Sequence, residues 1–184
     1  AKMIVTLPGQ TFTSGVGNVN APSAQMAGVP FDLTLRAVDD ANMIDIGYSG
    51  TKTISYSGPG GSPTYTTSVN FTAGQATAVS TTLKKAETTT LTATDGTRIG
   101  VASSSLIINP AAFSQLQVLA PGETAVPGTA SGKTGTLVSQ NVGTPFNVTV
   151  NAVDANWNLV STNDNLHVTT SLATTLPPDN TLLN

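Results

Sequence analysis

The sequence predicts an all-β protein built from β-sandwich repeats, and three observations carry this prediction. Threonine accounts for 31 of the 184 residues, whereas charged residues make up only 9%. β-Branched side chains favour strands over helices, and we expect no helix longer than a turn or two because no 12-residue window keeps helical apolar spacing. Apolar and polar residues alternate through "FDLTLRA" at 31–37, which is the pattern of a strand with one buried face. The same pattern then returns later in the chain.

The third observation is this internal repeat. "AGVPFDLTLRAVDD" at 27–40 returns as "VGTPFNVTVNAVDA" at 142–155. "LPGQ" at 7–10 likewise matches "APGE" at 120–123, and "DANM" from Asp40 aligns with "DANW" from Asp154. The match covers roughly 55 residues with a period of about 114, which is the size of one β-sandwich domain.

Seven strands are predicted in the first copy, and turn-forming residues separate them. "GPGGSP" at 58–63, "AGQ" at 73–75 and "DG" at 95–96 supply positive-φ positions and remove backbone donors where strands must end. Seven short strands at this spacing are typical of two packed sheets. The predicted strands are Met3–Leu7, Pro30–Asp39, Thr51–Ser57, Thr66–Thr72, Ala76–Leu83, Thr88–Thr94 and Ala102–Asn109.

The two copies place a domain boundary next to "INPAAF" at 108–113. We predict a complete sandwich over residues 1–111 and a second repeat over 112–184 that lacks its C-terminal strands, because few residues follow Ser171. The short connection should hold the two end to end. The second repeat should then expose apolar side chains such as Val148 and Val150. Either the chain is part of a longer array whose next residues complete this repeat, or a strand from a neighbouring chain completes it, or this half folds differently from the first copy; of these, we favour the array.

Several of these stretches resemble the bacterial immunoglobulin-like (Big-type) tandem repeats of long secreted or surface-attached bacterial proteins. The resemblance lies in the repeated "PF-x-L/V-T-L/V-x-A-V-D" strand, in "KAETTTLTATDG" at 85–96, in "SSSLIINPAA" at 103–112 and in "PGETAVPGTASGKTG" at 121–135. It implies tandem immunoglobulin-like β-sandwiches in an extracellular or cell-surface stalk, adhesin or fibre, where such repeats serve as structural spacers. The implied partners are neighbouring repeats or chains of the same protein.

Charge and composition exclude other classes of partner. The net charge is −3 with a pI near 4.8, so the positive field that attracts nucleic acid is absent. No run of about 18 apolar residues predicts a membrane span. The chain has no cysteine and a single histidine, His167, which alternation places on an outward face. No reactive residue recurs in both copies, so we predict that the protein is not an enzyme and needs no cofactor.

A cluster of carboxylates offers one candidate metal site. Asp39, Asp40 and Asp45 lie close together in "VDDANMID", and oxygen ligands two residues apart in a loop can hold Ca²⁺. Asp and Asn also close tight turns through hydrogen bonds to their own backbone. We favour the turn, because the second copy keeps a single carboxylate, Asp154, at this position.

Trp157 is the candidate ligand-binding residue. An exposed Trp can stack on a sugar ring, so a carbohydrate-binding accessory module of a secreted protein is the alternative function, with a glycan as its ligand. Trp157 aligns with Met43 in the repeat, which favours packing between sheets or domains instead. Three tyrosines could share either role, and they are Tyr48, Tyr56 and Tyr65.

Overall fold

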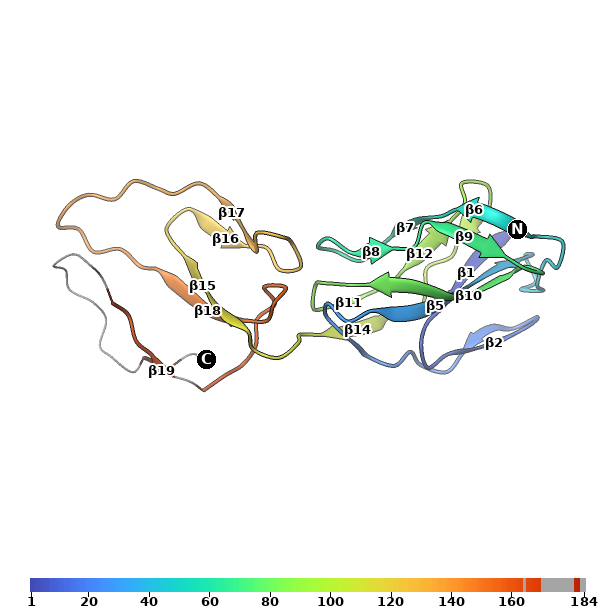
Figure 1. The fold of residues 1–184 in the computed structure, drawn as a ribbon, viewed down its shortest axis with the longest axis horizontal. Coiled ribbons are helices and arrows are strands. Elements are labelled where there is room, and N and C mark those ends of the chain that lie inside the picture. The colour runs from blue at the N-terminus through green and yellow to red at the C-terminus, as the bar shows by residue number, and fades with distance from the viewer. Residues whose placement is uncertain (164, 170–180, 183–184) are drawn as a thin grey trace.

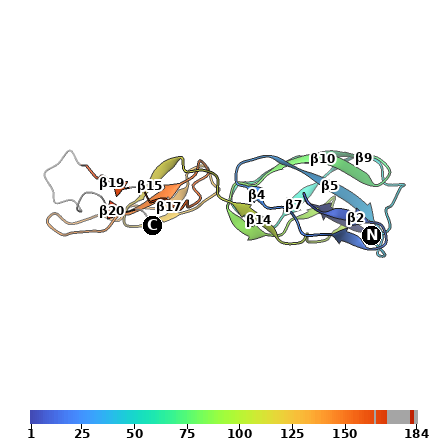
Figure 2. The same cartoon turned by 90° about the horizontal axis from the view of Figure 1, so that it is seen from below.

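The computed structural model describes residues 1–163, 165–169 and 181–182. Within these residues every regular element is a β-strand, which confirms the all-β class. Figures 1 and 2 show two bodies that lie end to end along the long axis. A single stretch between β14 (Leu106–Asn109) and β15 (Gln115–Leu119) connects them. We call residues 1–111 the N-terminal part and residues 112–184 the C-terminal part.

The largest sheet of the N-terminal part is built around β5 (Phe31–Val38), the strand with the clearest alternation in the sequence. Leu33 and Leu35 are 1% and 0% exposed, so the predicted inward face is the buried one. Strands on both edges pair antiparallel with β5, and they place Val5 opposite Leu35 and Val79 opposite Leu33. In spatial order the sheet contains β13 (Ile99–Gly100), β1 (Lys2–Thr6), β5, β10 (Gln75–Thr82) and β8 (Thr64–Tyr65).

Shorter ladders supply the rest of the core. Their apolar side chains, such as Phe71 and Leu106, join those of β1, β5 and β10 in one buried cluster. Removing this apolar surface from water is the main stabilising contribution to such a fold. The arrangement is consistent with a β-sandwich. The ladders are β11 (Glu87–Thr89) with β14 and β4 (Gln25–Met26), β12 (Thr92–Thr94) with β7 (Ser55–Ser57), and β6 (Gly50–Thr53) with β9 (Ser68–Phe71).

Two of the predicted strands are interrupted, and a third begins four residues later than predicted. The stretch 51–57 divides at Ile54, because β6 pairs with β9 whereas β7 pairs with β12. The stretch 88–94 divides in the same way before Leu91, which is fully buried. The prediction for 102–109 was too long, because Ser103 leaves the ladder: its N–H donates to the Leu91 carbonyl at 2.9 Å and its Oγ accepts from the Leu91 N–H at 2.9 Å.

Other strands have no counterpart in the prediction. The loop after "LPGQ" contains a hairpin of β2 (Thr11–Thr13) and β3 (Gly17–Val19), and its turn uses the positive φ of Gly15 and Gly17. The two-residue strands β4, β8 and β13 are too short for alternation to reveal them.

The C-terminal part is smaller and more open. β18 begins at Thr149 rather than near Phe146 as predicted, because its partner β15 ends at Leu119, opposite Thr149. Val148 is 44% exposed, as expected, whereas Val150 is half-buried. The segment after Ser171 lies outside the described residues except for 181–182. The remaining strands are β16 (Glu123–Ala125), β17 (Lys133–Gly135), β18 (Thr149–Val153), β19 (Asn165–Leu166) and β20 (Thr181–Leu182).

The three tyrosines pack against the core of the N-terminal part. The rings of Tyr56 and Tyr65 stack with centroids 4.4 Å apart, and the edge of Tyr48 meets Phe71 at 4.9 Å. Burial raises the pKa of Tyr56 to about 12, and burial likewise raises that of Tyr65 to about 12. These rings therefore contribute to packing.

The raised tyrosine pKa values predict a loss of stability at high pH. Unfolded tyrosine ionises near pH 10, so between about pH 10 and 12 the folded state keeps protons that the unfolded state releases. Stability should decrease as pH rises through this window. Spectrophotometric titration of the folded chain should show tyrosinate forming well above pH 10, and ionisation near pH 10 before unfolding would contradict the packing described here.

Candidate junction between the two parts

The loop that follows β18 is organised by one buried carboxylate. Asp154 is fully buried, and its Oδ1 accepts the backbone N–H groups of Asn156 at 2.8 Å and Asn158 at 3.0 Å. The Asp154 N–H in turn donates to the Asn158 carbonyl at 3.0 Å. Asp suits this position because its short side chain can close a turn on its own backbone.

The second carboxylate oxygen of Asp154 reaches across the connection between the parts. Oδ2 accepts the backbone N–H of Ala111 at 2.9 Å and the side-chain Nδ2 of Asn158 at 2.9 Å. Four donors thus surround a carboxylate that has no access to water. A buried charge is costly unless its hydrogen-bonding capacity is filled, and here the donors fill it.

Asn158 extends these contacts to the N-terminal part. Asn158 is only 2% exposed, and its side-chain amide bonds to the turn between β10 and β11. Oδ1 accepts the Ala86 N–H at 2.7 Å, and Nδ2 donates to the Lys84 carbonyl at 2.8 Å. A primary amide carries both an acceptor and donors. It can therefore bond a backbone N–H and a backbone carbonyl at this end of the sheet, as a neighbouring strand would do.

Close backbone approach completes the contact. The Ser62 N–H donates to the Gly128 carbonyl at 2.9 Å. Gly128 has a φ of +77°, and a Cβ there would lie within 2.9 Å of Lys85 atoms, so only glycine fits without displacing the turn. We define the junction by its three hydrogen-bonding contributors, Asp154, Asn158 and Gly128.

The three aspartates of the candidate metal site have different partners. Asp39 Oδ1 accepts the N–H groups of Ala41 at 2.9 Å and Met43 at 2.8 Å, which is the turn geometry that the sequence favoured. Asp40 pairs with the N-terminal ammonium at 3.1 Å, and this hydrogen bond lowers its pKa. Asp45 pairs with Arg98. Among the residues that the structure describes, no three His, Cys, Asp or Glu side chains are placed to hold a metal ion.

This geometry predicts that calcium has little effect on stability. Because Asp39 uses its carboxylate to close its own turn, EDTA should leave the melting temperature unchanged, and added CaCl₂ should do the same. Differential scanning calorimetry of the full chain measures both. A shift of many degrees on chelation would show that Asp39, Asp40 and Asp45 share an ion in solution.

Trp157, the candidate ligand-binding residue, lies within the junction loop. Its side chain is half-buried against Gly132, and its Nε1 donates to the Ala130 carbonyl at 3.3 Å. Trp157 and Asn42 both have positive φ at matching turn positions, 67° and 62°. The structural counterpart of Trp157 is therefore Asn42, not Met43, because the hydrogen bonds of the turn align Asp154 with Asp39.

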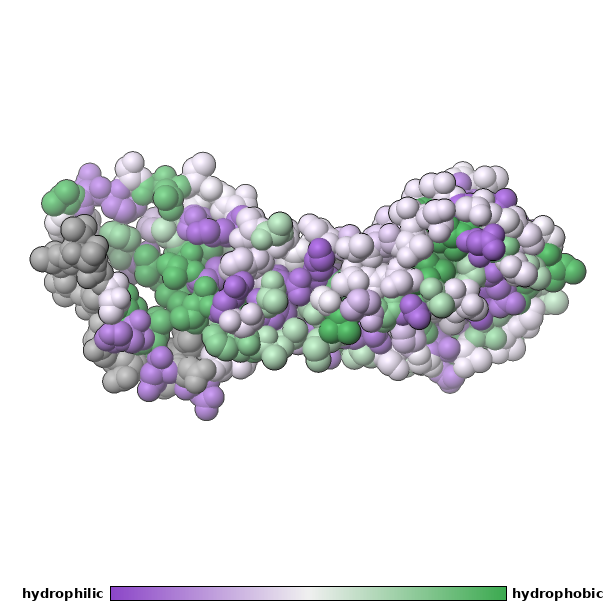
Figure 3. Space-filling model, in the orientation of Figure 1, coloured by the Kyte–Doolittle hydropathy of each residue, from purple (hydrophilic) through white to green (hydrophobic). Residues whose placement is uncertain are grey.

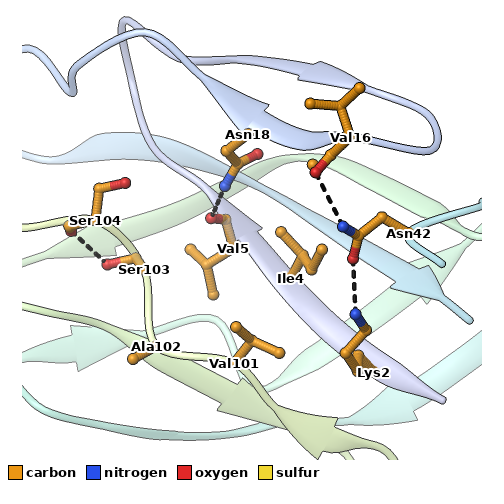
Figure 4. Close-up of a pocket in the computed structure, with 11 residues that line it drawn as sticks. Lys2, Ile4, Val5, Val16, Asn18, Asn42, Val101, Ala102, Ser103 and Ser104 are labelled. Atoms are coloured by element: carbon orange, nitrogen blue, oxygen red, sulfur yellow. Dashed lines mark hydrogen bonds between the residues drawn. The ribbon is translucent and has the colours of Figure 1, made fainter. Parts of the chain in front are cut away.

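A shallow pocket of about 310 Å³ lies beside β1 (Figure 4). The Asn18 amide donates to the Val5 carbonyl at 2.8 Å and so covers part of the open edge of β1. Lys2, the only titratable residue in the lining, donates to Asn42 Oδ1 at 2.8 Å. The polar side chains of this lining are bonded to neighbouring residues, since the Ser103 hydroxyl accepts from the Leu91 N–H and donates to the Ser104 carbonyl.

Sequence reasoning did not identify the junction, although one signal was present. Asn158 occupies the position that Met43 has in the first copy, and a polar residue replacing an apolar one next to a short linker indicates a changed environment. His167 follows β19 and is exposed, as predicted.

Comparisons with known proteins add no relative to this description. No family model, curated protein or solved structure matches the chain. In the part of the chain that the structure describes, no helix is long and apolar enough to cross a membrane.

Proposed function

We propose that the chain is a structural spacer module of an extended extracellular bacterial stalk, adhesin or fibre, and that it acts without catalysis. The observation that carries the proposal is the junction, where two loops of the C-terminal part, around Asp154 and Asn158 and around Gly128, bond to the linker and to two turns of the N-terminal part. A fixed joint of this kind transmits orientation along a rod. Flexible connections between domains lack such contacts.

The strand pairing of the N-terminal part supports a mechanical role. β1, which begins at the outer end, pairs parallel with β13, and β14, which leads into the linker, pairs parallel with β4. Tension along the long axis therefore pulls both terminal strands along their neighbours and loads their hydrogen bonds together. Paired strands whose hydrogen bonds break one at a time resist force less well.

Single-molecule force spectroscopy tests this proposal. The chain has no cysteine, so Ala1→Cys and Ser161→Cys provide unique handles. We expect the N-terminal part to unfold in one high-force event with a length gain of roughly 35 nm, at ~3.6 Å per residue. Gradual extension without a force peak would contradict a load-bearing spacer.

A glycan array separates the spacer from the carbohydrate-binding alternative. The half-buried position of Trp157 against Gly132 supports packing rather than stacking on a sugar. We expect no glycan signal above background. A signal that Trp157→Ala abolishes while the junction stays intact would assign the chain to the binding class.

A further inference from the structure

The hairpin that follows the first strand of each part differs between the two parts in the length of its loop. β2 and β3 leave three residues, 14–16, between their last paired positions, whereas β16 and β17 leave seven, residues 126–132. The turn that leads into each hairpin is the same, since the N–H of Gln10 in one part and of Glu123 in the other closes it with a 3.0 Å bond. We call residues 126–132 the docking loop, because Gly128 in this loop contacts the N-terminal part (Figure 1).

In both parts a side chain from the turn after β5 or β18 bonds to the hairpin loop. The Asn42 side-chain amide donates to the Val16 carbonyl at 2.9 Å, and Trp157 Nε1 donates to the Ala130 carbonyl at 3.3 Å. Asn42 and Trp157 occupy the same position of the turn, and both have positive φ. The longer loop therefore has the larger side chain beside it.

The indole of Trp157 lies directly on the backbone of the docking loop. A Cβ at Gly132 would lie 2.2 Å from ring atoms of Trp157. The Gly128 N–H donates to the carbonyl of Asn156, the neighbour of Trp157, at 2.7 Å. The base of the loop closes on itself, because the Val126 N–H donates to the Gly132 carbonyl at 2.7 Å. Trp157 and Asn156 thus fix the part of the loop that reaches the N-terminal part.

The contact of the docking loop with the N-terminal part needs exact placement. The Ser62 N–H donates to the Gly128 carbonyl at 2.9 Å, and a Cβ at Gly61 would lie 3.0 Å from that carbonyl oxygen. Figure 3 shows mainly pale and hydrophilic residues where the two bodies meet, rather than an apolar patch. A hydrogen bond is lost when its atoms move apart by about 1 Å, so a small shift of the loop breaks this contact.

We infer that Trp157 is a positioning residue, whose indole holds the docking loop where the Gly128 carbonyl meets the Ser62 N–H. The inference rests on the proposed function and deepens it, because it names the side chain that sets one of the two loops of the junction. It also makes the two parts unequal. Among the residues that the structure describes, a seven-residue hairpin loop and a Trp beside it occur together in the C-terminal part, whereas the N-terminal part pairs a three-residue loop with Asn42.

Hydrogen exchange of single amides, measured by NMR on the full chain, tests the role of Trp157. Trp157→Asn introduces the residue type that the N-terminal part has at this position, and Asn adopts positive φ readily, so the turn is kept. The Ser62 amide hydrogen should exchange at least about tenfold faster, because its acceptor moves away. The Ala86 amide hydrogen should keep its rate, because Asp154 still holds Asn158, its acceptor.

Trp157→Phe is the matched control, since it keeps a ring against Gly132 and should keep most of the protection of Ser62. Unchanged exchange at Ser62 in Trp157→Asn, or equal acceleration in Trp157→Phe, would overturn the inference and leave the contacts of Asp154 in place. Acceleration at Ala86 as large as at Ser62 would also overturn it, because Trp157 would then act on the whole junction. A Ser62 amide without protection in the unsubstituted chain would contradict both the inference and the fixed joint of the proposed function.

Discussion

Replacing Leu35 with alanine is expected to lower the free energy of unfolding of the N-terminal part by about 2–5 kcal/mol. Leu35 is fully buried at the centre of β5, between β1 and β10, and belongs to the main apolar cluster. Truncation removes its contacts and leaves a cavity that a strand paired on both edges cannot collapse to fill. Urea denaturation followed by far-ultraviolet circular dichroism measures the loss.

Thr34→Ala is the matched control for this prediction. Thr34 precedes Leu35 on the same strand but points to the opposite face and is half-buried. Its truncation should cost about 1 kcal/mol or less. Equal losses at Leu35 and Thr34 would show that the strand register is wrong, because a shift by one residue exchanges the two faces.

Replacing Asp154 with alanine is expected to destabilise the junction by at least about 3 kcal/mol. The substitution leaves the N–H groups of Ala111, Asn156 and Asn158 without their acceptor; the Asn158 contact is buried, and the other two are part-buried. Each unsatisfied buried donor costs about 1–3 kcal/mol. Trp157 is the only tryptophan and lies in the same loop, so its fluorescence during urea unfolding reports the loss directly.

Asp39→Ala is the control that isolates the contribution of the junction. Asp39 accepts two backbone N–H groups in the same turn geometry, but it is exposed, and among the residues that the structure describes its hydrogen bonds stay within its own turn. Water replaces its hydrogen bonds, so the expected cost is about 1 kcal/mol. Similar costs for the two substitutions would mean that the contact between the parts adds little stability.

The sequence predicted strands best where a strand pairs with the same neighbouring strands along its whole length. Alternation from Phe31 to Ala37 identified β5 and its buried face, because one side of that strand meets the core throughout. The breaks at Ile54 and before Leu91 could not be predicted. At both places the side-chain pattern continues while the backbone changes partner, and the partner is set by residues far away in the chain.

The junction could not be predicted for a related reason. Asp39 and Asp154 close nearly identical turns, and local sequence explains both. Their roles differ because the linker brings Asp154, but not Asp39, against another surface. The identity of "DAN" in both copies also favoured an alignment that is wrong by one residue, whereas the turn hydrogen bonds align the two aspartates.

The distance between the two parts in solution tests the central claim, that the junction fixes them as one rod. Spin labels at Ser80→Cys on β10 and Thr134→Cys on β17, both exposed strand positions, report this distance by double electron–electron resonance in samples diluted with unlabelled chain. The account predicts one narrow distance distribution that Asp154→Ala broadens. A broad distribution in the unsubstituted chain, unchanged by Asp154→Ala, would contradict it.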